Sequence, residues 1–373
     1  MDAASLSLLH VDTTLDWRGG QAQVEALLRA LAARGHRVSL VTPAGGRLAE
    51  RLADSPVEIV ADAPRGEWDR WAGRRLRAVA MERQVQLLHV HSARAHAMAW
   101  WAVDRRSSIP IVVSRRVDFP IGGNWFSRRK YLHPACFYLA ISTAVRDVLL
   151  RGGVDAERVF LVPSGVDPDQ FTYRTDREAT RRSLGIGAGE LLVCNVAALT
   201  DHKDHATLVR AARLALEQAA HLRFIVLGEG ELRAALEAQI RQANLGDRFR
   251  LLGFVDDVEP YLAAADLFVL SSHLEGLCTS LLDAMLLGVP VVATRAGGVP
   301  DVVADGETGL LVEPRDSDAL AGAVVRLSRD AALRAALAAA AGRRVRDCFS
   351  VKQTAALTET AYRNILDRWS RNR

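Results

Sequence analysis

Residues 265–309 read ADLFVLSSHLEGLCTSLLDAMLLGVPVVATRAGGVPDVVADGETG, and they contain the clearest secondary-structure pattern of the chain. The apolar run Leu267–Leu270 indicates a buried strand of a parallel sheet. A short loop with Glu275 follows, then a helix predicted to begin near Thr279, and then a second apolar strand at Val289–Ala293. A strand, a helix and a further strand in this order predict a βαβ unit.

Two carboxylates flank the start of the predicted helix, Glu275 just before it and Asp283 one turn inside it. Open α/β sheets bind their ligands at the carboxyl ends of the strands. The first N–H groups of a helix have no partner within the helix, and they favour an anion. The arrangement therefore favours a diphosphate attached to a group that is rich in hydroxyls.

The same alternation of strands and helices extends outward in both directions. Strands are predicted in the first half at Leu6–His10, Arg37–Val41, Val57–Val60, Leu87–Val90, Ile111–Ser114, Phe137–Ile141 and Val159–Val162. In the second half they are predicted at Leu191–Val196, Arg223–Leu227 and Arg248–Leu251, followed by the two strands above. The pattern predicts an α/β protein with two Rossmann-like, doubly wound parallel sheets, in residues 1–166 and 167–350, and a last helix within 351–373.

Composition excludes several classes of protein. The 373 residues are 49% apolar and 25% charged, as is usual for a globular protein, and no apolar run is long enough to cross a membrane. The N-terminus has no signal-peptide pattern, so we expect a cytoplasmic protein. The four cysteines are widely spaced, which argues against a zinc site or a disulfide framework.

Charge is distributed unevenly along the chain. Residues 1–165 contain 23 basic and 16 acidic residues, a net charge of +7, and the remainder brings the total to +4. A basic N-terminal half fits an acidic acceptor or the anionic inner surface of a membrane. The alternative is that the excess of arginine reflects only the base composition of the genome. No recognised nucleic-acid-binding module is present, so we expect no nucleic-acid partner.

The stretch from Glu275 to Asp283 resembles the donor-sugar signature E-x7-E of retaining nucleotide-sugar glycosyltransferases of family four, which have the GT-B fold. Here aspartate replaces the second glutamate. The resemblance implies two Rossmann-like domains that face each other across a cleft. It also implies that the nucleotide sugar binds the C-terminal domain, that the acceptor binds the N-terminal domain, and that helix 351–373 returns to the N-terminal domain.

The resemblance also implies roles for residues of the signature. Glu275 would bind hydroxyls of the donor sugar and stabilise positive charge at the anomeric carbon. The N–H groups of Thr279, Ser280 and Leu281 would bind the distal phosphate or the sugar. Asp283 would bind the ribose hydroxyls, by a longer or water-bridged contact because its side chain is one methylene shorter than that of glutamate.

Other donor-binding candidates follow from the same resemblance. Lys203 matches the lysine of a G-R-L…K pattern that binds the diphosphate, but Ala198 stands where that pattern has arginine. We expect the missing charge to weaken phosphate binding unless another cation replaces it. The candidates for that replacement are His202, His205 and Arg295.

Glycines mark another strand end of the second half. Gly228 and Gly230 follow the strand Arg223–Leu227 and match the G-x-G of the donor site, where glycine lets the backbone approach a phosphate or a ribose. Alone, such a turn is common between a strand and a helix. Phe254 and Val255 fall where related enzymes hold the base.

The N-terminal half supplies acceptor candidates. Gly19 and Gly20 resemble a mobile glycine loop over the donor phosphates and the acceptor, and a plain loop before a helix is the alternative. His91 ends a strand and is a candidate lining residue of the acceptor cleft, whereas His89 is expected in the core. Arg116 occupies the position at which relatives place histidine. Arginine stays protonated and cannot act as a base, so Arg116 suggests an anionic acceptor, with a solvated basic face as the alternative.

Three tryptophans are further candidates for sugar binding. Trp100, Trp101 and Trp125 offer flat apolar surface on which a sugar ring could stack. Packing in the core or at a domain interface is the favoured alternative.

Taken together, the residues and the resemblance predict a retaining, metal-independent glycosyltransferase without a cofactor, with Glu275, Lys203 and Arg116 as its catalytic set. It would move a hexose-type sugar from a UDP- or GDP-sugar to a cell-envelope glycan or a lipid-linked acceptor, with peripheral contact to the inner membrane. No D-x-D motif in a metal-binding context appears. The alternatives are a nucleotide-sugar 2-epimerase of the same fold and a non-catalytic nucleotide-sugar-binding subunit.

Overall fold

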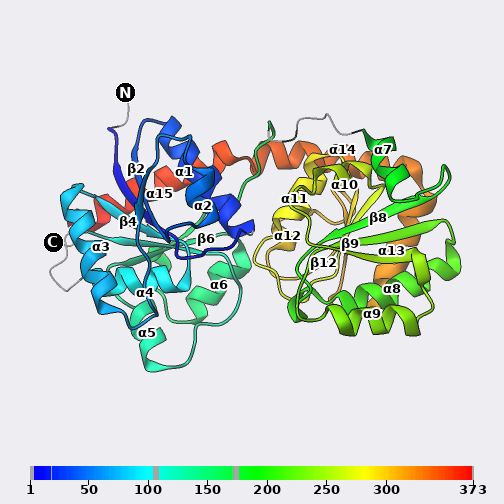
Figure 1. Ribbon diagram of the computed structural model, residues 1–373, viewed down its shortest axis with the longest axis horizontal. Coiled ribbons are helices and arrows are strands. Elements are labelled where there is room, and N and C mark those ends of the chain that lie inside the picture. Colours follow the sequence, from blue (N-terminus) through cyan, green and yellow to red (C-terminus); the bar gives the residue numbers. More distant parts are fainter. Residues whose placement is uncertain (1–3, 18, 104–108, 170, 172–175, 372–373) are drawn as a thin grey trace. The chain divides into compact units, whose positions relative to one another are not determined.

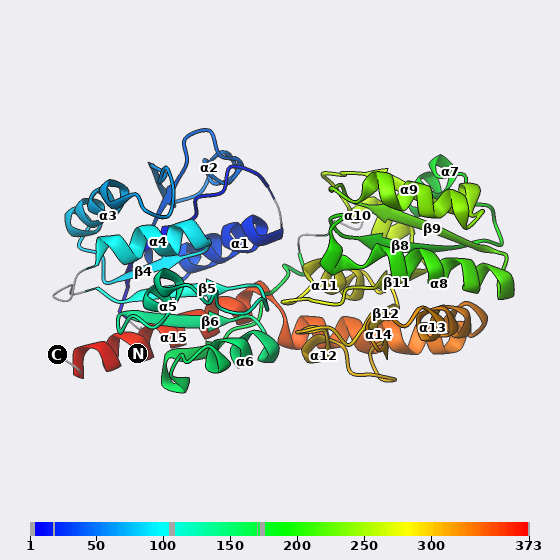
Figure 2. The same ribbon diagram turned by 90° about the horizontal axis from the view of Figure 1, so that it is seen from below.

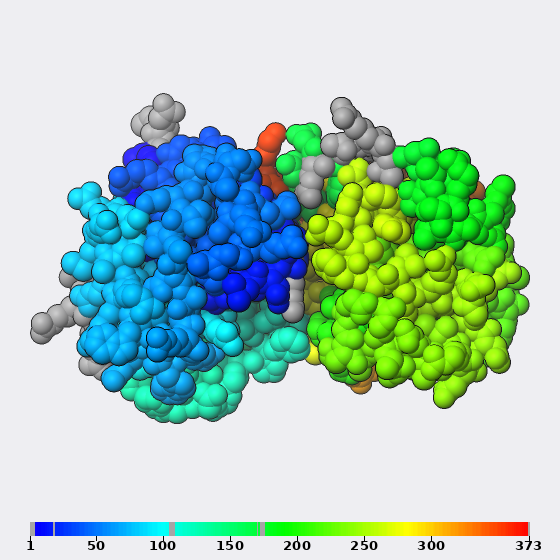
Figure 3. All heavy atoms as spheres, viewed as in Figure 1, coloured from blue at the N-terminus to red at the C-terminus, as the bar shows by residue number. Residues whose placement is uncertain are grey.

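A computed structural model describes residues 4–17, 19–103, 109–169, 171 and 176–371 (Figure 1). The chain divides into two compact units, an N-terminal unit of residues 1–165 and 351–373 and a C-terminal unit of residues 166–350. Figure 3 draws all heavy atoms of both, the N-terminal unit mainly in blue and cyan and the C-terminal unit mainly in green and yellow. Among the described residues, no helix is both long and apolar enough to cross a membrane.

The N-terminal unit contains a seven-stranded parallel sheet in the order β3-β2-β1-β4-β5-β6-β7. The strands are β1 (Ser7–Val11), β2 (Arg37–Thr42), β3 (Glu58–Ala61), β4 (Leu87–Val90), β5 (Ile111–Arg115), β6 (Cys136–Ala140) and β7 (Val159–Leu161). The helices are α1 (Gly19–Ala33), α2 (Arg47–Arg51), α3 (Arg70–Glu82), α4 (Ala93–Ala102), α5 (Trp125–Tyr131), α6 (Thr143–Arg151) and the 3-10 turn η1 (Ala156–Arg158). The last helix of the chain, α15 (Val351–Arg371), also belongs to this unit.

Apolar side chains explain why α15 lies on this sheet. Its buried residues include Tyr362 and Ile365, which join the same core as Leu28 of α1 and Leu40 of β2. Figure 1 shows α15 beside α1 on one side of the strands, with α4 on the other side. The final helix therefore completes the core of the unit that contains the start of the chain.

The C-terminal unit contains a six-stranded parallel sheet in the order β10-β9-β8-β11-β12-β13. The strands are β8 (Leu191–Val196), β9 (Leu222–Leu227), β10 (Phe249–Gly253), β11 (Leu267–Leu270), β12 (Val291–Thr294) and β13 (Leu310–Val312). The helices are α7 (Arg177–Ser183), α8 (His205–Gln218), α9 (Arg233–Gln242), α10 (Glu259–Ala264), α11 (Thr279–Leu286), α12 (Val299–Val302), α13 (Ser317–Arg329) and α14 (Ala331–Cys348), with 3-10 turns η2 (Asp201–Lys203) and η3 (Gly246–Arg248). Figure 2 shows α8 and α13 beside this sheet.

The two parallel sheets of this α/β chain agree with the prediction from the sequence. Most strands begin or end one or two residues from their predicted bounds. Strand β12 begins at Val291 rather than Val289, because Pro290 has no N–H to donate to the ladder. Strand β13 is not predicted by the sequence pattern, because its three residues are too few to give a clear one.

The prediction of a loop at Gly19 and Gly20 is wrong, because both residues lie in the first turn of α1. Asp12, just after β1, lies close to this turn, since its carboxylate accepts a hydrogen bond from the Gln21 amide at 3.3 Å. A carboxylate near the start of a helix stabilises that end. Glycine permits many backbone conformations and did not itself specify a loop.

Candidate active site

Two loops meet at the carboxyl edge of the C-terminal sheet. Lys203 follows β8 and Glu275 follows β11, and these two strands are neighbours in the sheet. The strand order runs from β8 to β9 in one direction and to β11 in the other, so this is the topological switch point at which open sheets bind ligands. Both residues lie at strand ends, and the structure brings their side chains into contact.

A buried ion pair forms at this point. The Nζ atom of Lys203 lies 2.5 Å from Oε2 of Glu275, and the hydroxyl of Ser272 donates a hydrogen bond of 3.2 Å to the same oxygen. Glu275 is 8% exposed, and the Lys203 side chain is 15% exposed. The ammonium group of Lys203 and the carboxyl group of Glu275 are therefore held side by side at the edge of the sheet.

The start of α11 lies next to this pair in the chain. Its N-cap residue, Cys278, makes no capping hydrogen bond with its side chain, whereas Asp204 caps α8 and Asp316 caps α13. The Ser280 hydroxyl donates to the carbonyl of Val196 at 2.9 Å and fixes α11 against the end of β8. The first turn of α11, which contains Thr279, Ser280 and Leu281, thus begins at a cysteine, whose sulfur is only a weak acceptor for the Leu281 N–H.

Cys278 itself is not suited to act as a nucleophile. Burial raises the pKa of its thiol to about 11, so the thiol is neutral at physiological pH. Its sulfur lies 3.2 Å from the Ser280 hydroxyl oxygen. Its buried position fits a role in packing.

Asp283 lies on the first turns of α11 and is partly buried. Within the described part of the chain, no hydrogen bond or ion pair to its carboxylate is present. Burial raises the pKa of this carboxyl from 3.8 to about 7. A carboxylate that is buried at a cost, without a partner in the protein, suits a ligand that donates hydrogen bonds.

Glycine is required at positions 228 and 230 for a steric reason that is not visible in the sequence. A Cβ atom added to Gly228 would lie 1.9 Å from the carbonyl oxygen of Ala197, and one added to Gly230 would lie 2.4 Å from that of Leu199. Gly228 also has a φ of +150°. These two glycines therefore allow the loop after β9 to pack closely against the backbone of the loop that leads to Lys203.

Phe254 and Val255 follow β10 at the same edge of the sheet. Phe254 is 64% exposed, which is unusual for a large apolar side chain, and Val255 is partly buried. Gly253, the last residue of β10, accepts a hydrogen bond of 2.8 Å from the Gly228 N–H through its carbonyl. The loops after β8, β9 and β10 are thus connected by backbone hydrogen bonds.

The three candidates to replace the missing arginine at Ala198 differ in their surroundings. His205 is buried, contacts the Asn195 side chain at 3.1 Å, and has its pKa lowered to about 4 by burial, so it is neutral at pH 7 and cannot supply the charge. Arg295 forms an ion pair of 2.5 Å with Asp305. His202 remains in the loop beside Lys203, with its Nδ1 atom 3.2 Å from the Thr200 hydroxyl.

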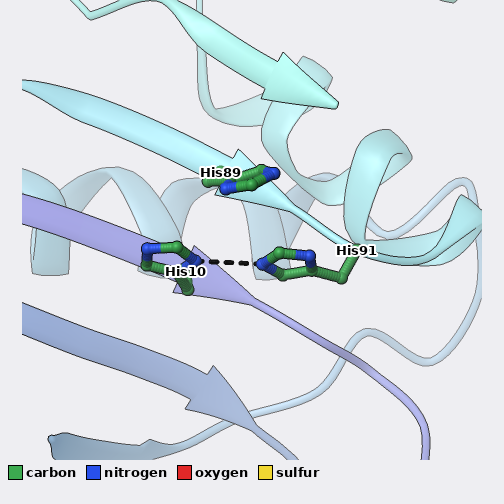
Figure 4. A group of neighbouring side chains, drawn as sticks. All are labelled: His10, His89 and His91. Atoms are coloured by element: carbon green, nitrogen blue, oxygen red, sulfur yellow. Dashed lines mark hydrogen bonds between the residues drawn. The ribbon is translucent and has the colours of Figure 1, made fainter. Parts of the chain in front are cut away.

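A second group of polar side chains lies at the carboxyl edge of the N-terminal sheet (Figure 4). His10 of β1 and His89 of β4 are in register across the two strands, and His91 follows two residues after His89. Nδ1 of His10 lies 2.9 Å from Nε2 of His91, as the dashed line in Figure 4 shows. Nη2 of Arg116 donates to Nδ1 of His91 at 3.3 Å, so His91 carries its proton on Nε2.

All three imidazoles are neutral because burial lowers their pKa values, that of His10 to about 3. His89 uses both ring nitrogens, with Nδ1 at 2.5 Å from the Tyr362 hydroxyl and Nε2 at 2.8 Å from the Ser114 hydroxyl. The spacing of the three rings would suit metal ligands, since one nitrogen from each lies within 4.8 Å of the others. The hydroxyl partners of His89 and the positive charge of Arg116 oppose a bound cation.

His10 is a polar residue of this group that the sequence pattern does not single out. The signal was available in principle, because His10 and His89 occupy the ends of two strands that a doubly wound sheet places side by side. Recognising it required the strand order and the register, and neither is visible in a periodicity pattern.

Arg116 is half-buried just after β5. Burial lowers the pKa of its guanidinium to about 10, although Asp12 and Tyr362 act in the opposite direction. Among the residues that the structure describes, no carboxylate lies within 4 Å of it. A guanidinium that is partly desolvated without an ion-pair partner favours an anionic ligand.

Comparisons with known proteins agree with this architecture. The family "Glycosyl transferases group 1" matches residues 176–344, and "Glycosyltransferase Family 4" matches residues 17–170. The amylovoran biosynthesis glycosyltransferase AmsK of Erwinia amylovora is 30% identical over 227 residues, which are 59% of this chain and 52% of that protein. The chain thus spans about half the length of that relative.

Solved structures show the same fold. A glycosyltransferase from Rickettsia africae has a TM-score of 0.86 at 17% identity, over 98% of this chain and 99% of the other. Anabaena HepE, solved with UDP-glucose, has a TM-score of 0.81 at 23% identity, over 95% of this chain and 99% of the other. The two family matches together cover most of the chain, which therefore belongs to the family 4 type of glycosyltransferase with the GT-B fold.

Proposed function

We propose that the protein is a retaining glycosyltransferase that moves a hexose-type sugar from a UDP- or GDP-sugar to a cell-envelope glycan or a lipid-linked acceptor, without a metal ion. The observation that carries the proposal is the buried pair of Lys203 and Glu275 beside the start of α11, where no strong capping side chain is present. A fixed cation and helix N–H groups suit a diphosphate, and a fixed carboxylate suits the sugar. HepE, which shares the fold, was solved with UDP-glucose, and this supports a nucleotide-sugar donor.

The proposed chemistry assigns each donor-site group one task. Lys203 and the N–H groups at the start of α11 would stabilise the negative charge of the departing diphosphate, which is the task that a metal ion performs in other enzymes. Glu275 would stabilise the positive charge that develops at the anomeric carbon. Asp283, when ionised, would accept hydrogen bonds from the ribose hydroxyls.

No side chain of the described site is placed as a covalent nucleophile, because Glu275 is held by Lys203 and Ser272 and the Cys278 thiol is neutral. We therefore favour attack on the same face from which the diphosphate leaves. The bond between the anomeric carbon and the phosphate oxygen breaks, and the bond to the acceptor oxygen forms. The departing phosphate oxygen accepts the proton of the acceptor hydroxyl, so charge and protons balance.

The N-terminal unit supports a proposal about the acceptor and its location. Arg116, without a carboxylate partner among the described residues, favours an acceptor that carries phosphate or carboxylate. Trp68 and Trp71 are 64% and 69% exposed, and the Arg74 guanidinium lies 4.6 Å from the Trp71 ring centre. Exposed tryptophan beside arginine suits the surface of an anionic membrane, so we propose peripheral contact with the cytoplasmic face of the inner membrane.

A thermal-shift screen with UDP, GDP, ADP and their sugars tests the donor proposal. A nucleotide that binds the folded protein raises the melting temperature by mass action, and we expect this from UDP or GDP. The Glu275→Gln variant should keep the shift with the free nucleotide and lose transfer and hydrolysis of the nucleotide sugar. Absence of any nucleotide-dependent shift would contradict the proposal.

The same preparation distinguishes the alternatives. Consumption of UDP-GlcNAc alone, with formation of its 2-epimer, would indicate an epimerase. Nucleotide binding without transfer and without slow hydrolysis of any sugar donor would indicate a non-catalytic subunit. For membrane contact, Trp71→Ala should reduce flotation with anionic vesicles and leave the nucleotide shift unchanged.

A further inference from the structure

A large groove lies in the N-terminal unit, with a cavity volume of about 1360 Å³. Four of the seven tryptophans of the chain line it, namely Trp100, Trp101, Trp125 and Trp369. They come from three helices, α4, α5 and α15, so the groove exists only because the last helix of the chain packs on this unit. These tryptophans include the three that were sugar-stacking candidates from the sequence.

The groove is separate from the candidate active site. Pro134 and Ala135, which line it, come just before β6, and Arg158 comes just before β7. It therefore lies at the amino edge of the parallel sheet, whereas His91 and Arg116 follow β4 and β5 at the carboxyl edge. A strand of five residues such as β5 spans about 16 Å, which is too far for one residue to serve both places.

Charge distinguishes this groove from an apolar pocket. Arginines 129, 158, 368 and 371 line it, against the two acids Asp155 and Glu157. The Arg129 guanidinium lies 5.1 Å from the Trp125 ring centre, and the Arg158 side chain is held by a hydrogen bond of 2.9 Å to the His133 carbonyl. Flat aromatic walls with an excess of guanidinium groups thus line one concave surface.

We propose that this groove is a second carbohydrate site, which binds an acidic oligosaccharide. Indole faces stack on the apolar faces of sugar rings, and guanidinium groups bind carboxylates through paired hydrogen bonds. The concave shape favours this ligand over a membrane surface, because Trp100, Trp101 and Trp369 are half-buried in the walls and cannot enter a bilayer. The site would hold a glycan at the edge of the N-terminal sheet opposite to His91 and Arg116.

Titration of the full-length protein with hexagalacturonate, followed by tryptophan fluorescence, tests the inference. We expect saturable quenching that weakens as the salt concentration rises, because the guanidinium contacts are partly exposed. Maltohexaose, a neutral chain of the same length, should bind at least about tenfold more weakly, because it lacks the charge-assisted contacts. Equal binding of both chains, or of neither, would overturn the proposal.

Variants distinguish binding in the groove from nonspecific attraction between the anionic chain and the basic protein. Arg129 and Arg371 are exposed, so the double change R129Q/R371Q should leave the fold intact and lower the affinity for hexagalacturonate at least about tenfold. The matched control R241Q/R343Q removes two exposed arginines of the C-terminal unit and should leave the affinity unchanged. Trp125→Ala, at a side chain that is 66% exposed, tests the stacking.

Two outcomes would refute the carbohydrate assignment. The first is equal loss of affinity in the R129Q/R371Q variant and in the control. The second is binding of anionic phospholipid vesicles, but not of hexagalacturonate, that depends on Arg129 and Arg371. The nucleotide-dependent thermal shift of the C-terminal unit is measured in parallel, so failure of this inference and failure of the proposed donor site are distinguishable.

Discussion

Replacing Asp283 by asparagine should make the protein more stable and its nucleotide binding weaker. Burial raises the pKa of this carboxyl from 3.8 to about 7, and no partner in the described chain compensates the charge. In the unfolded chain the carboxyl ionises near its ordinary value. At pH 8 the folded protein therefore holds an ionised group that burial disfavours.

The magnitude follows from that difference. The interval between 3.8 and about 7, at about 1.4 kcal/mol per pKa unit, corresponds to a destabilisation of about 4 kcal/mol at pH 8. Because the folded pKa is the higher one, the destabilisation is absent below pH 3.8, grows as the pH rises to about 7, and is constant above. An amide buried without partners costs about 1–3 kcal/mol itself. We therefore expect Asp283→Asn to be about 1–3 kcal/mol more stable at pH 8.

Urea unfolding at pH 5, 6, 7 and 8 measures this difference in stability. The relevant unfolding transition is that of the C-terminal unit, which is recognised because added nucleotide shifts it. The stability difference between Asp283→Asn and the parent protein should increase with pH up to about 7 and then level off. Nucleotide affinity should fall about tenfold or more, since the amide offers one acceptor oxygen where the carboxylate offers two. Asp318→Asn, at an exposed position on α13, is the control. A difference that is the same at every pH, or unchanged nucleotide affinity, would refute the reasoning.

Three further predictions concern other parts of the structure. Glu275→Gln should lower the turnover number about 10²–10³-fold with little change in UDP or GDP affinity, because its carboxylate stabilises charge in the transition state; an equal loss of nucleotide binding would contradict this. Gly228→Ala should destabilise the C-terminal unit by about 3 kcal/mol in urea, because its Cβ would meet a backbone carbonyl at 1.9 Å, whereas Gly189→Ala, with open space around it, should be neutral. Burial would raise the pKa of Glu359, yet hydrogen bonds from two arginines hold this pKa at about 2. The ionised carboxylate therefore stabilises the fold above pH 4.5, and this contribution disappears as the pH falls to about 2. Glu359→Gln should therefore cost about 2 kcal/mol at pH 7 and less at pH 3 in thermal unfolding, and a loss independent of pH would count against the ion pair.

Much of the fold is visible in the sequence, because short apolar runs and helical periodicity are local properties. The strand Leu267–Leu270 and the start of α11 at Thr279 agree with prediction at both positions. The positions of Lys203 and Glu275 at strand ends follow from the same local patterns. In a parallel sheet all carboxyl ends lie at one edge, so the sequence could also indicate that both face the ligand-binding edge.

Contacts between distant residues needed the tertiary structure. The 2.5 Å contact of Lys203 with Glu275 depends on β8 and β11 being neighbours, and the pairing of His10 with His89 depends on the register of β1 and β4. The need for glycine at position 228 also depends on the fold, because it comes from the Ala197 carbonyl that lies against this residue.

By itself, the sequence determined the α/β class, the two parallel sheets and the strand ends that carry polar side chains, since each depends on residues close together in the chain. Three features became visible only in the folded chain: which strand ends touch, the groove lined by Trp100 and Trp369, and the helix that begins at Gly19 and Gly20. The physical reason is that strand order, register and the packing of α15 arise from burial of apolar surface summed over a whole unit, and no local pattern encodes that sum.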